Sequence, residues 1–310
     1  MSVSRRDIVR LSLSAVPLVR AFAGVNSQFN GVQLGICSFS FRGMGFDELV
    51  RQMTAVPMGQ LELESSFIEP VAAPAGPAGA PGAGRGPGRG QTPEQREALR
   101  KWRLTVPLDD IRVFRRRLDD AGIDVYAYNI PLNDTFTEEE LDRVFRMARL
   151  LGATVLNSAA AMTMVPRLAA MAERYNMRVG LHPGAANTPD AIGSAESYHK
   201  ALAISPWIGA NPDLNGWTTW GADPIAFVRE IAPRITTLHT HDSKPADPRP
   251  LASPFGEGHN PIREVLQLMK KDKLTFVAMV ERTYNLPEGA DNVAELRKSL
   301  AYCQTALKAG

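Results

Sequence analysis

The strongest constraint on the fold is a repeated alternation of short β-rich runs with segments of helical period. Apolar residues three or four positions apart fill the segments between the runs, which is the spacing of amphipathic helices. Strands separated by helices favour a parallel sheet with helical crossovers. The predicted strands are Gln33–Cys37, Gln60–Glu64, Asp124–Ile130, Thr154–Asn157, Met177–Leu181, Trp207–Pro212, Ile235–Leu238 and Thr275–Val280.

The helical segments between these strands have recognisable starts and ends. Thr137 and Glu140 form the capping-box pattern at the start of one helix, and Gly152 stops it. The predicted helices are Phe46–Ala55, Leu108–Ala121, Thr137–Leu151, Val165–Tyr175, Ala195–Ala203, Pro224–Ile231, Pro261–Met269 and Val293–Leu307.

Roughly eight strand–helix units in about 280 residues have the count and length of a (β/α)8 TIM barrel, an α/β fold. An open doubly wound sheet shows the same alternation. However, no Gly-x-Gly-x-x-Gly turn follows the first predicted strand, so the dinucleotide-binding form of that sheet loses support.

The N-terminus has the pattern of a twin-arginine signal peptide over residues 1–23. Arg5 and Arg6 precede an apolar run from Leu11 to Ala23, which ends in a small-x-small cleavage pattern. We expect a periplasmic protein, or a signal-anchored one where cleavage does not occur. No later stretch is long and apolar enough to span a bilayer.

The expected barrel domain, residues 24–310, contains one low-complexity segment. Residues 71–93 are dominated by Pro, Ala and Gly, which cannot bury enough apolar surface to fold. We predict a disordered loop there.

Charge argues against nucleic-acid binding. The whole chain has a formal net charge of +2, but without residues 1–23, which hold four arginines and one aspartate, 31 basic and 32 acidic residues remain. A near-neutral mature chain lacks the basic footprint of a nucleic-acid binder.

The two cysteines, Cys37 and Cys303, have no spacing typical of a zinc site or redox pair. A disulfide between them is possible in an oxidising compartment, but two buried free thiols are the simpler interpretation.

Polar residues with metal-binding side chains follow many of the predicted strands. In a TIM barrel, side chains at the C-terminal strand ends converge on one pocket. Each residue alone would more often be structural, but together they favour a bound cation. Their oxygen and nitrogen ligands suit Mn²⁺, Zn²⁺, Co²⁺ or Mg²⁺, and the sequence does not choose among these. The residues are Glu62, His182, Asp213, His239, His241 and Glu281.

Several segments resemble one known family. They include His239-Thr240-His241-Asp242, Gly256-Glu257-Gly258 and Val280-Glu281. With these segments, residues 32–307 resemble the xylose-isomerase-like, sugar phosphate isomerase/epimerase family of TIM barrels. The resemblance implies a divalent metal held by the residues that match the family's ligands by position: His182, Asp213, His239 and Glu281.

The chain departs from the family pattern at three positions. His182 stands where many members have Glu, Gly216 where a His is common, and His241 where Lys often precedes the Asp. The resemblance implies that Glu281 and His182 act as catalytic acid and base beside a metal-polarised carbonyl. His182 is also a candidate metal ligand.

The remaining candidate residues are expected to bind the substrate. Trp217 offers an aromatic face to a sugar, and Lys244 offers a positive charge. The predicted substrate-binding residues are Glu62, His241, Lys244, Glu257 and Trp217, and the expected ligand is a small sugar or keto-sugar. Relatives in the family are commonly oligomeric, so a homo-oligomer is possible.

Four functions remain open. The family resemblance favours a metal-dependent sugar isomerase or epimerase. A keto-glycoside lyase or dehydratase would use a similar site, and the changes at His182 and Gly216 are compatible with a non-catalytic periplasmic sugar-binding barrel. An endonuclease for abasic DNA is disfavoured by the neutral charge and the export signal.

Overall fold

The computed structural model describes residues 25–70, 92–184, 190–215, 223–246 and 250–308. The predicted signal peptide and Trp217 lie outside these residues, as does most of the predicted Pro/Gly-rich loop. In the described part of the chain, no helix combines the length and the apolar character needed to cross a membrane.

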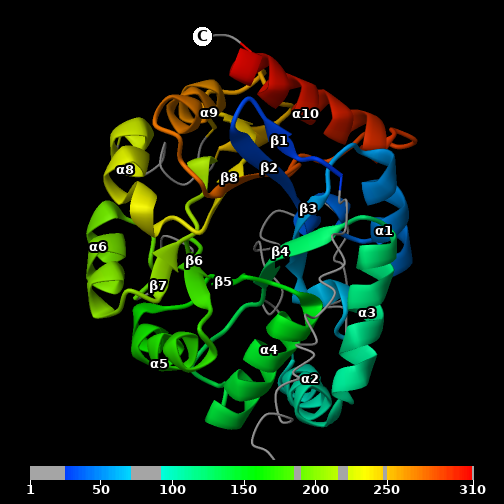
Figure 1. Ribbon diagram of the computed structural model, residues 1–310, viewed down its shortest axis with the longest axis vertical. Helices are drawn as coiled ribbons and strands as arrows, with labels where there is room; N and C mark the ends of the chain where they lie inside the picture. Colours follow the sequence, from blue (N-terminus) through cyan, green and yellow to red (C-terminus); the bar gives the residue numbers. More distant parts are fainter. Residues whose placement is uncertain (1–24, 71–91, 185–189, 216–222, 247–249, 309–310) are drawn as a thin grey trace, which may run out of the picture.

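Parallel strands form the predicted barrel, with the sheet order β7-β6-β5-β4-β3-β2-β11-β8. Parallel bridges from Ala210 to Ile235 and from Asp213 to His239 join β7 to β8, which nearly closes the ring. The fold prediction is therefore confirmed (Figure 1). The strands are β2 (Val32–Cys37), β3 (Gln60–Glu64), β4 (Asp124–Asn129), β5 (Val155–Ser158), β6 (Arg178–Leu181), β7 (Ile208–Ala210), β8 (Thr237–Thr240) and β11 (Val277–Val280).

Amphipathic helices surround the strands in Figure 1 and bury their apolar faces on the sheet. In α4, Leu141, Phe145 and Ala148 are fully buried, and the predicted capping box at Thr137 is present. These outer helices are α1 (Phe46–Ala55), α3 (Leu108–Asp120), α4 (Glu138–Leu151), α5 (Val165–Tyr175), α6 (Ala195–Ile204), α8 (Pro224–Ile231), α9 (Ile262–Lys271) and α10 (Asn292–Lys308). Short 3-10 turns are η1 (Ser38–Phe41), η2 (Ser65–Phe67), η3 (Met162–Met164) and η4 (Ala232–Arg234).

One helix was not predicted. Helix α2 (Pro93–Thr105) starts at a capping box on Thr92, so the predicted loop 71–93 extends two residues too far. Among its residues only Leu99 and Arg103 are buried. The helix therefore lacks the apolar stripe by which sequence periodicity identifies helices.

The strand that carries His239 starts later than predicted. The prediction was Ile235–Leu238, whereas β8 covers Thr237–Thr240; η4 ends at Arg234, and Ile235 forms an isolated bridge with Ala210 instead of starting the strand. His239 therefore lies within the strand rather than after it.

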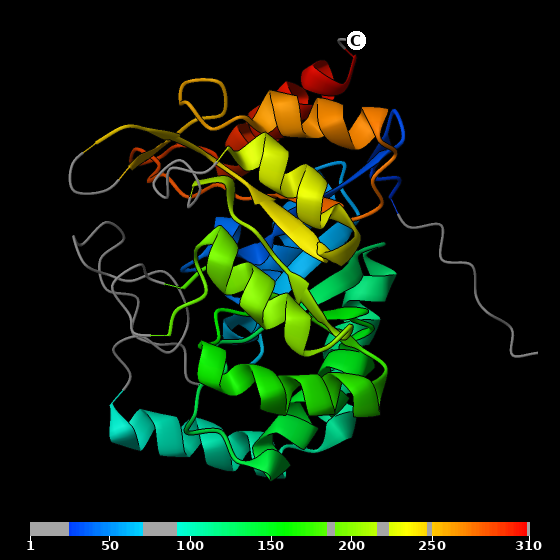
Figure 2. The ribbon, with the colours of Figure 1, turned by 90° about the vertical axis from the view of Figure 1, so that its left-hand side faces the viewer.

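Two short antiparallel additions lie at opposite ends of the barrel (Figure 2). Strand β1 (Gln28–Phe29) pairs with β2 at one end. Strands β9 (Asp242–Lys244) and β10 (Leu251–Ser253) form a hairpin at the other end, just after β8. Cys37 and Cys303 are both buried and free, as the simpler interpretation predicted.

Glycines make room inside the barrel for polar side chains. A Cβ atom on Gly180 would lie 2.2 Å from Asn157 Oδ1 and 2.2 Å from Thr236 Oγ1. Asn157 is fully buried and donates through Nδ2 to Glu62 Oε2 at 3.0 Å and to Thr237 Oγ1 at 2.7 Å. The interior layer below the barrel mouth is thus a hydrogen-bonded polar layer.

Candidate metal centre

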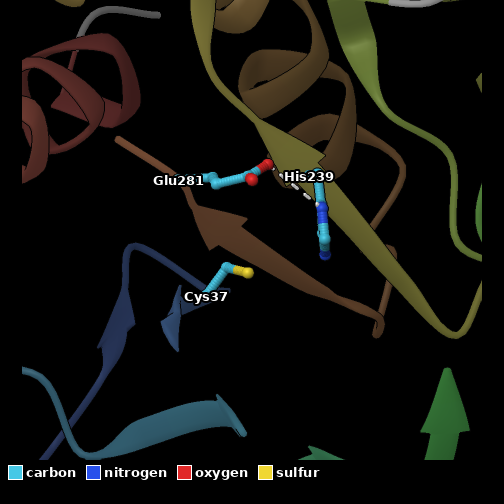
Figure 3. A group of neighbouring side chains, drawn as sticks. All are labelled: Cys37, His239 and Glu281. Carbon is cyan, nitrogen blue, oxygen red and sulfur yellow. Dashed lines mark ion pairs between the residues drawn. The ribbon is translucent and has the colours of Figure 1, made fainter. Parts of the chain in front are cut away.

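His239 lies at the centre of the polar cluster. Its Nε2 is 3.0 Å from Glu62 Oε2, and its Nδ1 is 3.2 Å from Glu281 Oε2. The side chain is 3% exposed, so both carboxylates act on it with little screening by water. Figure 3 shows Glu281 and His239 reaching toward each other from β11 and β8.

Glu62 holds one side of this imidazole ring. Its carboxylate accepts hydrogen bonds from Asn129 Nδ2 at 2.8 Å and from Asn157 Nδ2 at 3.0 Å, and it is fully buried. Glu62 was predicted to bind substrate, but its oxygens already face protein groups. Glu62 therefore orients the His239 ring, as carboxylates commonly do for histidines that bind metals.

His241 lies between two carboxylates and is 1% exposed. Its Nδ1 is 3.3 Å from Asp213 Oδ1 and 3.5 Å from Glu281 Oε2. His241 was predicted as a metal-competent strand-end residue and was assigned to substrate binding, and it lies among the predicted metal ligands. Residues two positions apart on a strand share a face, so His239 and His241 both point inward.

His182 completes the cluster from the end of β6. Its Nδ1 is 3.1 Å from the carbonyl oxygen of Pro183, which fixes Nδ1 as the protonated nitrogen. Nε2 is then an acceptor, and it lies 3.8 Å from Asp213 Oδ2. The ring centroids of His182 and His239 are 4.9 Å apart. All four predicted metal ligands are thus brought together.

The charges of these groups depend on one another. Burial alone would lower the pKa of His239, but Glu62 and Glu281 outweigh it and raise that pKa well above its usual value. Burial alone would raise the pKa of Glu281, but His239 and His241 hold it well below its usual range. Burial lowers the pKa of His182, helped by the neighbouring His239, so His182 stays neutral.

The donor atoms fit a cation. Among the described residues, His239 Nδ1, Glu281 Oε2 and both ring nitrogens of His241 are buried, and none is aligned for a hydrogen bond. Ligand atoms of His182, Asp213 and His239 lie within 4.8 Å of one another, and so do those of Asp213, His241 and Glu281. Buried polar atoms normally have partners, and a divalent metal would supply them here.

Two predicted residues lie at the rim instead. Lys244 Nζ is 3.1 Å from Glu257 Oε2, and the two side chains are 46% and 56% exposed. Asp242 Oδ2 accepts the backbone N–H groups of Gly256 and Gly258, which holds the loop around Glu257 in place. Trp217, the remaining predicted contact, lies outside the described residues.

Sequence reasoning missed several polar residues of the site. Asn129, Asn157 and Asn211 lie at or just after strand ends, and Asn211 Nδ2 is 3.4 Å from His239 Nε2. Cys37 ends β2, and its sulfur lies close to His239 and Glu281. The signal for all four was their position at strand ends, which the prediction applied only to acids and histidines.

Comparison with known proteins identifies the family. The family model for xylose isomerase-like TIM barrels matches residues 91–305. A search of the curated proteins gives no match.

Solved structures with similar folds cover nearly the whole barrel. The 3-keto-D-glucoside 4-epimerase YcjR from E. coli has a TM-score of 0.62 at 12% identity, over 88% of this chain and 99% of that one. A sugar phosphate isomerase/epimerase from Parabacteroides distasonis has a TM-score of 0.57 at 14% identity, over 90% and 96%. The probable 3-DHS dehydratase AsbF from Bacillus anthracis has a TM-score of 0.61 at 14% identity, over 86% and 98%. The fold, the match over residues 91–305 and the strand-end motifs agree: the chain belongs to the family of xylose isomerase-like TIM barrels.

Proposed function

We propose that the protein is a metal-dependent sugar isomerase or epimerase that moves a proton beside the carbonyl of a small sugar or keto-sugar. The observation that carries this proposal is the convergence of His182, Asp213, His239 and Glu281 on one buried cluster. Family membership adds support, since structures of similar fold include a 3-keto-D-glucoside 4-epimerase and a sugar phosphate isomerase/epimerase.

The metal would be held by His182 Nε2, Asp213, His239 Nδ1 and Glu281, with His241 beside them. When bound, it supplies a Lewis acid that polarises a carbonyl or hydroxyl oxygen. The orientation of His239 comes from Glu62, which accepts at Nε2 and leaves Nδ1 directed at Glu281.

Proton transfer needs one group that accepts a proton and one that returns it. Glu281 is the proposed proton acceptor, because the neighbouring histidines lower its pKa and keep its carboxylate unprotonated. His182 is the candidate partner when its Nε2 is not coordinated to the metal, because Nδ1 donates to the carbonyl oxygen of Pro183 and leaves Nε2 as the one ring nitrogen for either role. Its side chain is 20% exposed, against 7% or less for Asp213, His239, His241 and Glu281, so it faces the barrel mouth.

Metal analysis of the purified protein tests the centre. We expect one divalent metal per chain in protein prepared without chelator, and loss of that metal in His239→Ala. The control is His199→Ala, because His199 is 48% exposed and pairs with Glu230 away from the cluster. Metal-free wild-type protein that also binds none on titration would refute the proposal.

Proton exchange tests the chemistry. Ketoses and ketoglycosides are incubated with the metal-loaded protein in deuterated water, and deuterium uptake at the carbon beside the carbonyl is followed by NMR. We expect uptake with the wild type and none with Glu281→Gln. Loss of a leaving group with uptake would assign a lyase or dehydratase, and binding without uptake would assign a sugar-binding barrel.

We also propose that the protein is exported to the periplasm. The support is the Arg5-Arg6 pair ahead of the apolar run in residues 11–23. Cell fractionation should find the wild-type chain in the periplasm and a variant with both arginines changed to lysine in the cytoplasm. An unchanged distribution would contradict a twin-arginine route.

A further inference from the structure

We propose that Cys37 is a ligand of the metal and that the site consequently selects Zn²⁺ over Mg²⁺ and Mn²⁺. The inference rests on the metal centre of the proposed function and extends it by a sulfur donor from β2. It identifies the class of metal, which the oxygen and nitrogen donors leave open.

The geometry places the thiol against the metal donors. Ligand atoms of Cys37, His239 and Glu281 lie within 4.8 Å of one another, and Cys37 is 1% exposed. Figure 3 shows the three side chains converging from β2, β8 and β11. Sulfur and nitrogen ligands of a tetrahedral zinc ion are about 3.5 Å apart, so a contraction of about 1 Å brings the three atoms to coordination distance.

The two partners of the thiol point independently to a ligand. His239 is 2% exposed and Glu281 is 6% exposed. His239 Nδ1 and Glu281 Oε2 are buried, and neither atom has an aligned hydrogen bond. The two atoms are 3.2 Å apart as an ion pair. This contact does not give either atom the aligned hydrogen bond that buried polar groups usually make. A cation between them would also lie next to the sulfur.

The surroundings of Cys37 separate this thiol from an ordinary core cysteine. On one side it packs on Val277 and Met279 of β11, with Phe39 and Tyr126 nearby, and on the other it faces the charged cluster. Cys303 on α10 is also fully buried, but it belongs to the main hydrophobic core. Cys303 is therefore a matched control within the same chain.

A sulfur donor decides which metals bind well. Thiolate and imidazole ligands favour Zn²⁺ and Co²⁺, whereas Mg²⁺ and Mn²⁺ favour sites of oxygen ligands. A thiolate also adds a negative charge to those of Asp213 and Glu281, which strengthens binding of a divalent cation.

Cobalt spectroscopy tests the sulfur ligand without requiring activity. Chelator-treated full-length protein is titrated with Co²⁺ alone, and both the visible ligand-field bands and the near-ultraviolet sulfur-to-cobalt charge-transfer band are recorded. We expect both sets of bands in the wild type and in Cys303→Ser. Cys37→Ser should keep the ligand-field bands, lose the charge-transfer band and bind Zn²⁺ at least tenfold more weakly.

The outcomes distinguish this inference from the proposed function. Ligand-field bands without a charge-transfer band in the wild type overturn the role of Cys37 and leave the metal centre in place. Absence of all cobalt bands overturns both.

X-ray absorption of the zinc-loaded wild type gives a second measurement that needs no variant. A Zn–S distance of about 2.3 Å is expected beside the nitrogen and oxygen ligands. A shell of nitrogen and oxygen alone would overturn the assignment even where Cys37→Ser does not fold.

Discussion

At the scale of single residues, the position of a carboxyl group decides its charge. Glu62 and Glu64 are two residues apart on β3, and both are buried. The oxygens of Glu62 accept hydrogen bonds from Asn129 and Asn157 and face His239. Burial would raise the pKa of Glu62, but His239 outweighs burial and lowers that pKa. Burial raises the pKa of Glu64 to about 8, with Glu281 and Glu62 adding to the rise.

Glu64 should make the stability of the metal-free protein depend on pH. Its pKa is about 8 in the folded chain against an ordinary 4.5, so the folded state holds a proton that the unfolded state releases. Its contribution to stability is fully present below pH 4.5 and is lost as pH rises through about 8. We expect the melting temperature of Glu64→Gln to exceed that of the wild type by more at about pH 9 than at about pH 5.

Glu257→Gln is the control for this measurement, because the side chain of Glu257 is exposed at the rim. Melting curves in the presence of chelator check the prediction. A Glu64→Gln difference that is equal at both pH values would mean that the folded and unfolded chains titrate alike.

At the scale of elements, one buried arginine joins three segments on the outside of the barrel. Arg103 of α2 donates from Nε to Glu69 Oε1 at 2.7 Å and from Nη1 to Glu140 Oε1 at 3.0 Å. Its guanidinium also lies 4.7 Å from the ring centroid of Phe136. Arg103 therefore attaches the polar helix α2 both to the segment after β3 and to α4.

Removal of this guanidinium should be costly. Arg103→Ala leaves the buried carboxylates of Glu69 and Glu140 without their partner, and breaking such a pair typically costs about 3–5 kcal/mol. Arg100→Ala on the same helix should change the free energy of unfolding by less than about 1 kcal/mol, because its pair with Glu97 is exposed and spans 3.9 Å. Urea unfolding of both variants checks the prediction, and equal losses would contradict it.

At the scale of the whole molecule, the barrel depends on how β7 meets β8. The two strands are joined through the single bridges of Ala210 with Ile235 and Asp213 with His239. The second bridge joins two candidate metal ligands, so the barrel closes at the seam where the candidate metal centre lies.

A methyl group at this seam should weaken both stability and metal binding. A Cβ atom on Gly209 would lie 2.6 Å from Thr236 Cγ2 and 2.7 Å from the carbonyl oxygen of Arg234. We expect Gly209→Ala to lose about 1–3 kcal/mol of stability through overpacking and to bind Zn²⁺ more weakly. Gly45→Ala is the control, because no atom lies within 4 Å of the position of its Cβ. Calorimetry measures the loss of stability, and zinc titration measures the loss of affinity. A Gly209→Ala variant that is destabilised but binds Zn²⁺ as tightly as the wild type would show that metal binding does not depend on closure of the barrel.

Much of the barrel followed from local sequence signals. Period and capping predicted the strands and the helices with apolar stripes, because each signal is contained in a few neighbouring residues. Helix α2 was missed because its attachment is the buried charge of Arg103, which depends on Glu69 and Glu140 from elsewhere in the chain.

The sequence by itself determined the alternation of strands and helices and therefore which side chains end at the barrel mouth. Only the tertiary structure decided how they pair: Glu62 contacts His239, His241 lies among the candidate metal ligands, and Cys37 lies near Glu281. The physical reason is that parallel strands distant in sequence become neighbours on closure, and distances between their side chains depend on register and interior packing, which no local pattern encodes.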